Sequence, residues 1–203
     1  MPKSPNTHAK ANTAACVDAQ APTDAELVVL LQARQSQAVE ILLERYHGAL
    51  LAYAFRLLAD RQLAEDVVQE ALISCLQNLD KLRDPAKLRS YLYRIVTHGC
   101  RDQQRRSAHR EIVTDKLPDE ALSNPDYTER CYVSELLKQL SPQHKEVLVL
   151  RYYEDMDLET IAYTQGIPLG TVKSRLHHAL SRLKNQATVH EQKGKAGVLA
   201  HEP

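Results

Sequence analysis

The sequence predicts an all-α protein of two small helical bundles joined by a flexible linker, with a helix-turn-helix in the second bundle. Apolar residues recur at intervals of three and four over most of 24–106 and again over 140–186, the period of helices that pack on one face. Between these segments the period disappears, and prolines and acidic residues accumulate. Residues 157–186 read as a capped helix, a tight turn and a second amphipathic helix.

The composition is that of an ordinary soluble globular protein of one or two domains. The chain has 203 residues, of which 43% are hydrophobic and 26% charged, and its formal net charge is zero. Any charge that binds nucleic acid must therefore be sorted into patches. No apolar run approaches the ~20 residues of a membrane helix, and the N-terminus lacks the apolar segment of a secretory signal. These features predict a cytoplasmic protein without membrane insertion.

Cysteine and histidine spacing gives no sign of a metal centre. The cysteines at 16, 75, 100 and 131 form no C-x-x-C pair, which favours reduced thiols. His98 and Cys100 are two candidate ligands, whereas a zinc site needs three or four. The sequence therefore predicts no metal, no cofactor and no catalytic residue.

The first bundle is expected over 23–107, after a disordered leader at 1–22 that has no periodicity. Helical pattern begins at Thr23, with a short helix over 26–33. Ser36 is the expected cap of a long second helix that is broken at 60–61. A third helix follows over 63–79, and Asp84 with Pro85 begins a fourth that ends near Arg106.

The second bundle is expected over 127–186, after a linker at 108–126 and before a flexible tail at 187–203. Its first helix is predicted over 127–140. Ser141 and Pro142 read as a cap and a first-turn proline for a helix that reaches about Tyr153. Asp157 is then the expected cap of the next helix, and Gly166 can take the left-handed conformation that ends it.

The last helix of this bundle has a polar, basic outer side. Its predicted apolar stripe comprises Val172, Leu176, Ala179, Leu180 and Leu183. No acidic residue lies between Pro168 and Gln186. This layout is typical of a DNA-reading helix-turn-helix, although a solvated face on an ordinary helical hairpin is the alternative. The outer side carries Thr171, Lys173, Ser174, Arg175, His177, His178, Ser181, Arg182 and Asn185.

The third helix has a polar face opposite its apolar side. Asp66, Gln69 and Glu70 are spaced i, i+3 and i+4, so they lie together, and Ile73 falls among them. The face is either a solvated acidic surface with one stray apolar residue or a contact patch for an arginine-rich partner. The residues alone leave these two interpretations equal.

The fourth helix has a basic outer side with an aromatic ring and hydroxyl groups. Asp102 is the only acidic residue between Lys87 and Arg110. This pattern favours nucleic acid, since cations follow phosphates and a ring can stack on a base. The alternative is a solvated basic face. The outer side is expected to carry Ser90, Tyr93, Arg94, Thr97 and Arg101, followed by Arg105, Arg106 and Arg110.

Over about 24–186 the chain resembles a bacterial sigma factor of the extracytoplasmic-function group. Three stretches carry the resemblance, in the family's order and at its separation. AEDVVQEAL (64–72) is similar to the family's polymerase-contact motif, and LRSYLYRIVTHGCRDQQRR (88–106) resembles its promoter-melting helix. LSPQHKEVLVLRYYEDMDLETIAYTQGIPLGTVKSRLHHAL (140–180) resembles its region 4 throughout.

The resemblance implies that 23–107 is region 2, which binds core RNA polymerase and the minus-ten element, and that 127–186 is region 4, which binds the minus-thirty-five element. Such a factor directs polymerase to promoters and promotes DNA melting by capturing flipped bases. The implied polymerase contacts are Asp66, Gln69, Glu70 and Ile73. The implied minus-ten contacts are Asp80, Lys81, Arg83 and Lys87 in the loop, then Tyr93, Arg94, Thr97, His98 and Arg101. The implied minus-thirty-five contacts are Thr171, Lys173, Ser174, Arg175 and His178.

The family also implies the partners. These are the clamp helices of the largest polymerase subunit and the flap, promoter DNA, and an anti-sigma protein that silences the factor. The linker is expected near the active-site and RNA-exit channels of polymerase. The free chain is expected to be a cytoplasmic monomer, associated with the nucleoid when it is bound to polymerase.

Three positions depart from the family pattern. Leu76 and Tyr91 stand where tryptophan is usual, so the packing there is variant. His98 stands where asparagine is usual, which puts its contact with the melted strand in doubt.

Two rival functions belong to other classes. One is a helix-turn-helix activator with an unrelated helical sensor domain, because similar recognition helices occur in response regulators. The other is a nuclease that binds a metal through Glu65, Asp66 and Glu70, for which no further ligands are evident.

Overall fold

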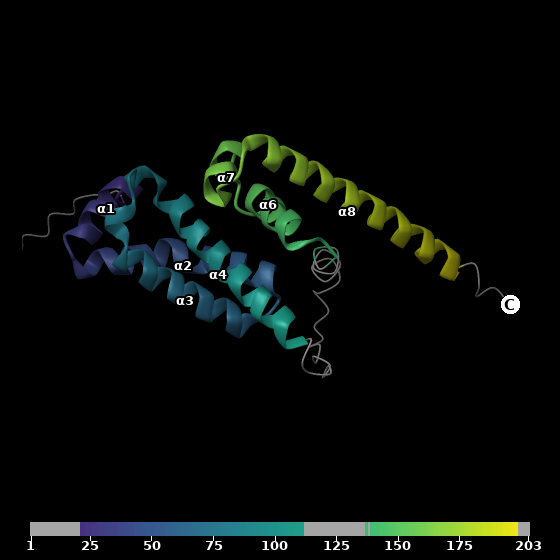
Figure 1. Cartoon of the computed structure of the whole chain (residues 1–203), viewed down its shortest axis with the longest axis horizontal. Coiled ribbons are helices and arrows are strands. Elements are labelled where there is room, and N and C mark those ends of the chain that lie inside the picture. Colours follow the sequence, from purple (N-terminus) through teal and green to yellow (C-terminus); the bar gives the residue numbers. More distant parts are fainter. Residues whose placement is uncertain (1–20, 112–136, 138, 199–203) are drawn as a thin grey trace, which may run out of the picture.

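The computed structural model describes residues 21–111, 137 and 139–198. Over these ranges the protein has seven α-helices, two short 3₁₀ segments and no strand (Figure 1), which confirms the predicted all-α class. The expected leader as far as residue 20, the linker from 112 and most of the helix predicted over 127–140 lie outside the described residues.

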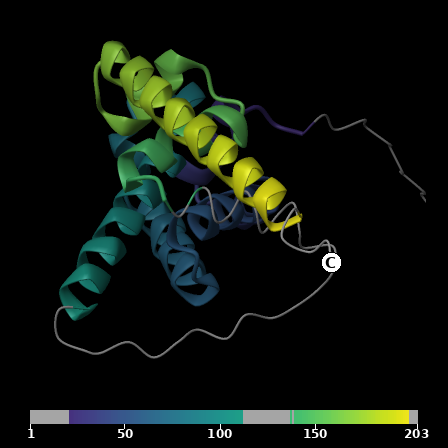
Figure 2. The ribbon, with the colours of Figure 1, turned by 90° about the vertical axis from the view of Figure 1, so that its right-hand side faces the viewer.

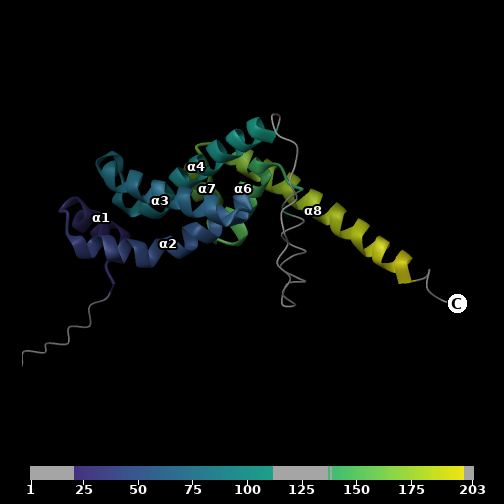
Figure 3. The same cartoon turned by 90° about the horizontal axis from the view of Figure 1, so that it is seen from below.

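The first bundle is built from α2 (Ser36–Leu58), α3 (Arg61–Gln77) and α4 (Leu88–Glu111), which pack on one another side by side (Figure 3). The short α1 (Asp24–Gln32) lies at one end, against α2 and the 3₁₀ segment η2 (Pro85–Lys87). A second 3₁₀ segment, η1 (Leu79–Lys81), follows α3. α4 runs five residues beyond the predicted end at Arg106. The buried interior includes the periodic positions Leu42, Leu50, Val68, Leu88, Leu92 and Val96, together with Tyr53 and Ala64.

Side chains cap two of the four α-helices in this bundle, α1 and α3. Thr23 caps α1 in a reciprocal capping box with Glu26. Asp60 caps α3, accepting from the backbone N–H of Leu63 at 2.9 Å. The predicted cap at Ser36 is wrong, because Ser36 is already the first helical residue of α2 and no side chain caps this end.

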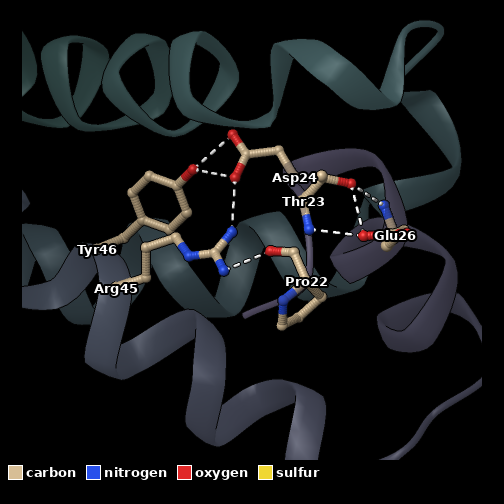
Figure 4. A network of polar contacts seen from close by, with 6 residues as sticks. All are labelled: Pro22, Thr23, Asp24, Glu26, Arg45 and Tyr46. Atoms are coloured by element: carbon tan, nitrogen blue, oxygen red, sulfur yellow. Dashed lines mark hydrogen bonds and ion pairs between the residues drawn. The ribbon is translucent and has the colours of Figure 1, made fainter. Parts of the chain in front are cut away.

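A polar network anchors α1 to α2 (Figure 4). The Tyr46 hydroxyl donates to the Asp24 carboxylate, with both oxygens 2.6 Å away. Arg45 pairs with the same carboxylate at 3.0 Å and donates to the Pro22 carbonyl. Burial, followed by the Asp24 contact, raises the pKa of Tyr46, so the phenol stays protonated and keeps donating. Because α1 packs on η2, this network also supports the loop between α3 and α4.

The second bundle contains α6 (Pro142–Tyr152), α7 (Leu158–Gln165) and α8 (Leu169–Val198). The helix-turn-helix prediction is confirmed: Asp157 caps α7, and Gly166 ends it at φ 66°. Ser141 precedes α6 as expected, but its hydroxyl contacts the His144 ring instead of capping the backbone. Leu180 was predicted on the apolar stripe and is 43% exposed.

α8 is much longer than predicted. The sequence pattern places its end at Gln186, whereas the helix continues to Val198 and projects away from both bundles (Figures 1 and 3). The intervening residues 187–193 contain no glycine or proline, so nothing local stops the helix there. The helix therefore ends later than predicted, and the flexibility of 187–203 stays a prediction.

The two bundles pack against one another. α7 lies on α4, and α6 lies on the C-terminal part of α2. Figures 1 and 2 show this arrangement from two sides. A charged and aromatic layer, described below, fills the contact between them.

A close approach of α3 and α4 generates a stability prediction. A Cβ at Gly99 would lie 2.8 Å from Cγ1 of Val67, whereas a Cβ at Gly48 meets nothing within 4 Å. Valine is stiff in a helix, so this overlap opposes the gain of about 1 kcal/mol expected when alanine replaces a helical glycine. We expect Gly99→Ala to be less stable than Gly48→Ala by roughly 1–3 kcal/mol, measured by urea unfolding followed by circular dichroism. Equal stabilisation by both changes would contradict the close approach.

Candidate functional site

The polar face of α3 is exposed, as predicted. Asp66, Gln69 and Glu70 are all solvent-accessible, and Ile73 among them is 48% exposed. Glu65, which precedes Asp66, pairs with Arg61 at 2.9 Å. We call Asp66, Gln69, Glu70 and Ile73 the α3 patch. It offers acid and amide oxygens around an apolar centre, a combination suited to an arginine-bearing protein surface.

The loop between α3 and α4 presents four polar side chains on a fixed backbone. Leu79 and Leu82 are buried and hold the loop to the bundle. Asp84 accepts from the backbone N–H of Ala86 at 3.1 Å and so caps η2. The predicted loop residues Asp80, Lys81, Arg83 and Lys87 are exposed.

The outer side of α4 is largely covered, contrary to expectation. Ser90 is buried, and Tyr93 and Thr97 are each 1% exposed. Thr97 donates to the Tyr93 carbonyl at 2.7 Å, and its oxygen lies 2.8 Å from the Tyr53 hydroxyl. The predicted outward orientation is therefore wrong for these residues, because α2 and the second bundle cover them. Their role in DNA binding stays a prediction.

Arg101 of α4 makes the main ion pair between the bundles. Its Nε and Nη2 donate to the two carboxylate oxygens of Glu146 on α6, at 2.8 and 2.6 Å. Nη2 also donates to the Gln165 side chain. The hydrogen bonds to Glu146 raise the pKa of Arg101, and Glu146 itself is 1% exposed. This bidentate geometry makes the ion pair both directional and strong.

A second carboxylate follows α6. Glu154 is 7% exposed and accepts from the hydroxyl of Tyr93, while its backbone carbonyl accepts from Arg89. Arg56 of α2 lies 3.7 Å from the same carboxylate. Burial and then the Glu154 contact raise the pKa of Tyr93, so its hydroxyl remains a donor.

Arg94 and His98 remain exposed on α4. The pKa of His98 is lowered, first by partial burial and then by Arg101 and Arg94. The lowered pKa favours the neutral ring, which has one donor and one acceptor nitrogen.

The basic face of α8 is open. Lys173, Ser174 and His178 are exposed, and Thr171 and Arg175 are half-buried. The Ser174 hydroxyl donates to the Thr171 carbonyl at 3.0 Å. Burial and the neighbouring cationic residues of α8 lower the pKa of His144, which lies beside His178. This face has the polarity expected of a helix that lies in a DNA groove.

Sequence reasoning missed the residues that join the two bundles. Arg56, Glu146, Glu154 and Gln165 received no role, although Glu146 carried a signal. It directly precedes the run Val147–Leu150, in which every residue is buried, and a carboxylate beside such a run needs a partner. The identity of that partner was not readable, because it lies 45 residues away.

In the described part of the chain, the structure supports neither a metal site nor a reactive cysteine. Among the residues searched, no three His, Cys, Asp or Glu side chains gather as a metal site. Cys75 and Cys100 are free and buried, and burial raises the pKa of each thiol to about 12, so they are unreactive. Over the same ranges, no helix combines the length and apolar character needed to cross a membrane.

Comparison with known families gives two matches. Residues 42–110 match the family model of Sigma-70 region 2, and residues 136–185 match that of Sigma-70, region 4. The first contains the α3 patch, the loop and most of α4, and the second contains the helix-turn-helix.

Individual relatives agree with this assignment. The chain is 35% identical over 140 residues to the RNA polymerase sigma-E factor of Streptomyces avermitilis, covering 68% of this chain and 78% of that protein. It is 33% identical over 159 residues to the ECF RNA polymerase sigma factor SigL of Mycobacterium tuberculosis, covering 75% and 90%.

Two solved structures share the fold. CnrH, in complex with the cytosolic domain of CnrY, has a TM-score of 0.65 at 24% identity, covering 84% of this chain and 99% of CnrH. The sigma factor RpoE of Bartonella quintana, solved with the anti-sigma factor NepR, has a TM-score of 0.64 at 24% identity, covering 74% and 96%.

The cap of the helix-turn-helix generates a prediction. The backbone N–H of Thr160 donates to Asp157 at 2.7 Å and lowers the pKa of that carboxyl. Asp157→Ala should lower the free energy of unfolding by about 1 kcal/mol, and Asp157→Asn, which keeps an acceptor, by less. A lowered folded-state pKa means that the charge contribution is complete above the ordinary value of 3.8 and is lost as the pH falls below it.

The measurement is urea unfolding of wild type and both variants at neutral pH and near pH 3. The wild-type advantage over Asp157→Asn should shrink at the lower pH. If Asp157→Ala leaves the free energy of unfolding unchanged, the side-chain cap does not stabilise α7.

Proposed function

Because the chain belongs to the sigma-70 family, in its extracytoplasmic-function group, it directs RNA polymerase to promoters, and we propose how its surfaces divide that task. Residues 23–107 form region 2 and residues 127–186 form region 4, joined by the linker at 108–126. Members of this family act in transcription initiation through binding, so the division assigns no catalytic residue. The region 2 match disfavours the activator with an unrelated sensor domain.

The α3 patch binds core polymerase. Its carboxylates are exposed and carry no ion pair within the described part of the chain, and Ile73 supplies apolar contact at the centre. Arginines on the clamp helices of the largest subunit would complete this surface, and the flap would receive region 4. One observation supports this division: the exposed α3 patch lies on one bundle, and the basic face of α8 lies on the other.

The loop and α4 hold the non-template strand at the minus-ten element. The exposed residues Asp80, Lys81 and Arg83 contact a base that is flipped into the loop. Binding of this base offsets the few kcal/mol that unstacking costs. Lys87, Tyr93, Arg94, Thr97 and Arg101 hold the neighbouring strand, with His98 in the position of the usual asparagine.

Region 4 reads the minus-thirty-five element with Thr171, Lys173, Ser174, Arg175 and His178. When the factor is silent, an anti-sigma protein binds both region 2 and region 4. In this division the free chain is a cytoplasmic monomer that reaches the nucleoid through polymerase.

Run-off transcription tests the function directly. Purified protein with core polymerase should give promoter-specific transcripts from promoters found by sequencing the transcripts that rise when the protein is overexpressed. Absence of any specific transcript would refute the function.

Charge reversal of the α3 patch should separate polymerase binding from DNA binding. Asp66→Arg with Glu70→Arg should weaken core binding by roughly 30-fold or more, since each reversal opposes arginines on the partner. Glu40→Arg with Glu44→Arg makes the same charge change at exposed positions of α2 and is the matched control. The measurement is core affinity by fluorescence anisotropy, with binding to duplex DNA assayed in parallel. Equal losses in the test and control variants would contradict the assignment.

Truncation of the basic face of α8 should change the salt dependence of DNA binding. Lys173→Ala or Arg175→Ala should weaken binding to a duplex that carries the minus-thirty-five element. If the lost contact is to phosphate, the slope of log affinity against log salt should fall by about 1. Arg61→Ala removes one exposed cation from the other bundle and should leave that slope unchanged. An unchanged slope in both α8 variants would exclude phosphate as their contact.

A further inference from the structure

The loop between α3 and α4 rests on α1. α1 packs against both 3₁₀ segments of this loop, η1 and η2, and also contacts α4. Leu27, Val28 and Leu31 of α1 are buried, as are Leu79 and Leu82 of the loop. The position of the loop on the first bundle therefore depends on the position of α1.

The shape of the loop is set locally, by short hydrogen bonds. The backbone N–H of Lys81 donates to the Asn78 carbonyl at 2.9 Å, and that of Lys87 donates to the Asp84 carbonyl at 3.0 Å. Each bond spans three residues, as in a 3₁₀ turn. Such bonds fix the turns but not their position relative to the other helices, so that position comes from the packing on α1.

The polar network of Figure 4 fixes the start of α1. α1 has nine residues, and a helix of this length is marginal by itself in water. Adjacent residues of α2 hold its first residue: Arg45 pairs with the Asp24 carboxylate at 3.0 Å, and the Tyr46 hydroxyl donates to it at 2.6 Å. Arg45 also donates to the carbonyl of Pro22, just before the helix. Because α2 packs on α3 and α4, these contacts tie α1 to the rest of the bundle.

We propose that Asp24, Arg45 and Tyr46 are positioning residues for the flipped base: they hold α1, and α1 holds the loop in the shape that receives the base. The inference rests on the assignment of this loop to the minus-ten element under the proposed function. The three side chains act through α1, since their polar groups contact one another and the Pro22 carbonyl. A loop that is ordered before the strand arrives loses less conformational entropy on binding, so it holds the base more tightly.

Two substitutions on α2 break the network. Arg45→Met with Tyr46→Phe removes the donors and leaves side chains of similar size in place. The Asp24 carboxylate then loses both contacts with α2, which loosens the start of α1. Arg61→Met with Tyr152→Phe makes the same two changes at exposed positions outside the network and is the matched control.

Amide hydrogen exchange measures the order of the loop in the full chain without polymerase. In the test variant, the amides within 81–87 should exchange roughly tenfold faster than in wild type, because the loop opens locally more often. The amides of α6 should be unchanged, which distinguishes local opening from general unfolding. The control variant should match wild type in both segments.

Strand binding by the full chain with core polymerase measures the functional consequence. The probe is the fluorescein-labelled non-template minus-ten strand of a promoter found by run-off transcription, and affinity is measured by anisotropy. Replacing one base at a time with an abasic site identifies, in wild type, the base whose loss weakens binding most. The test variant should bind the intact strand roughly tenfold more weakly, the factor that fixing the backbone of about one residue costs. It should bind the strand with the abasic site as wild type does, because no base then enters the loop.

Three results would overturn the proposal. One is an unchanged preference for the intact strand in the test variant. The second is equal weakening of the intact and abasic strands, because the network would then support the whole bundle and not base capture. The third is equal loss of preference in the test and control variants.

Tyr46→Phe alone keeps the test decisive if the double variant does not fold, as judged by circular dichroism. It removes one hydroxyl and keeps the ring in the core, and Tyr152→Phe is its control. Binding of the intact strand should weaken about threefold, the factor expected for one hydrogen bond, while binding of the abasic strand should not change. Equal affinities of this variant and wild type for the intact strand would refute the proposal.

The wild-type measurements separate this inference from the proposed function. If wild type with core polymerase gives no promoter-specific transcript, the sigma function itself is refuted. If wild type transcribes but no abasic site weakens its binding, the assignment of the loop is refuted, and the inference with it. A base preference that wild type shows and the test variant retains refutes only the positioning role.

Discussion

The arrangement of the two bundles depends on the burial of Glu146 against α4. This carboxylate is almost fully removed from water, and an unpaired charge in such a place costs several kcal/mol. Arg101 satisfies both of its oxygens. Neither partner is satisfied within its own bundle by any contact that the described residues show, so the ion pair ties α6 to α4. Replacing the pair with apolar residues could stabilise the contact just as well, so its value lies in specifying which surfaces meet.

The contact between the bundles leaves the α3 patch exposed but buries part of α4. The α3 patch is exposed, whereas Tyr93 and Thr97 of α4 are buried. The loop that precedes α4 is held independently, by α1 and by the Asp24 network with Arg45 and Tyr46. The contacts that hold the backbone of this loop therefore lie within the first bundle.

The first bundle meets the second with arginine, lysine and tyrosine side chains, including Arg56, Lys87, Tyr93 and Arg101. Arginine, lysine and tyrosine donate equally well to carboxylates and to phosphates, and their rings and cations tolerate different π partners. Because Glu146 and Glu154 are buried, salt screens their ion pairs less than it screens exposed pairs.

The sequence by itself determined the local structure: the helical class, the start of α7 at Asp157, its stop at Gly166 and the exposed face of α3. These features depend on period, caps and glycine, which act within a few residues. Only the tertiary structure decided that Tyr93 and Thr97 lie buried, that Glu146 meets Arg101, and that Gly99 approaches Val67. Helical periodicity identifies one apolar face, but it does not reveal whether a distant segment covers the polar face. The pairs that cover α4 join residues 45 and 61 positions apart, and no local pattern encodes such a pairing.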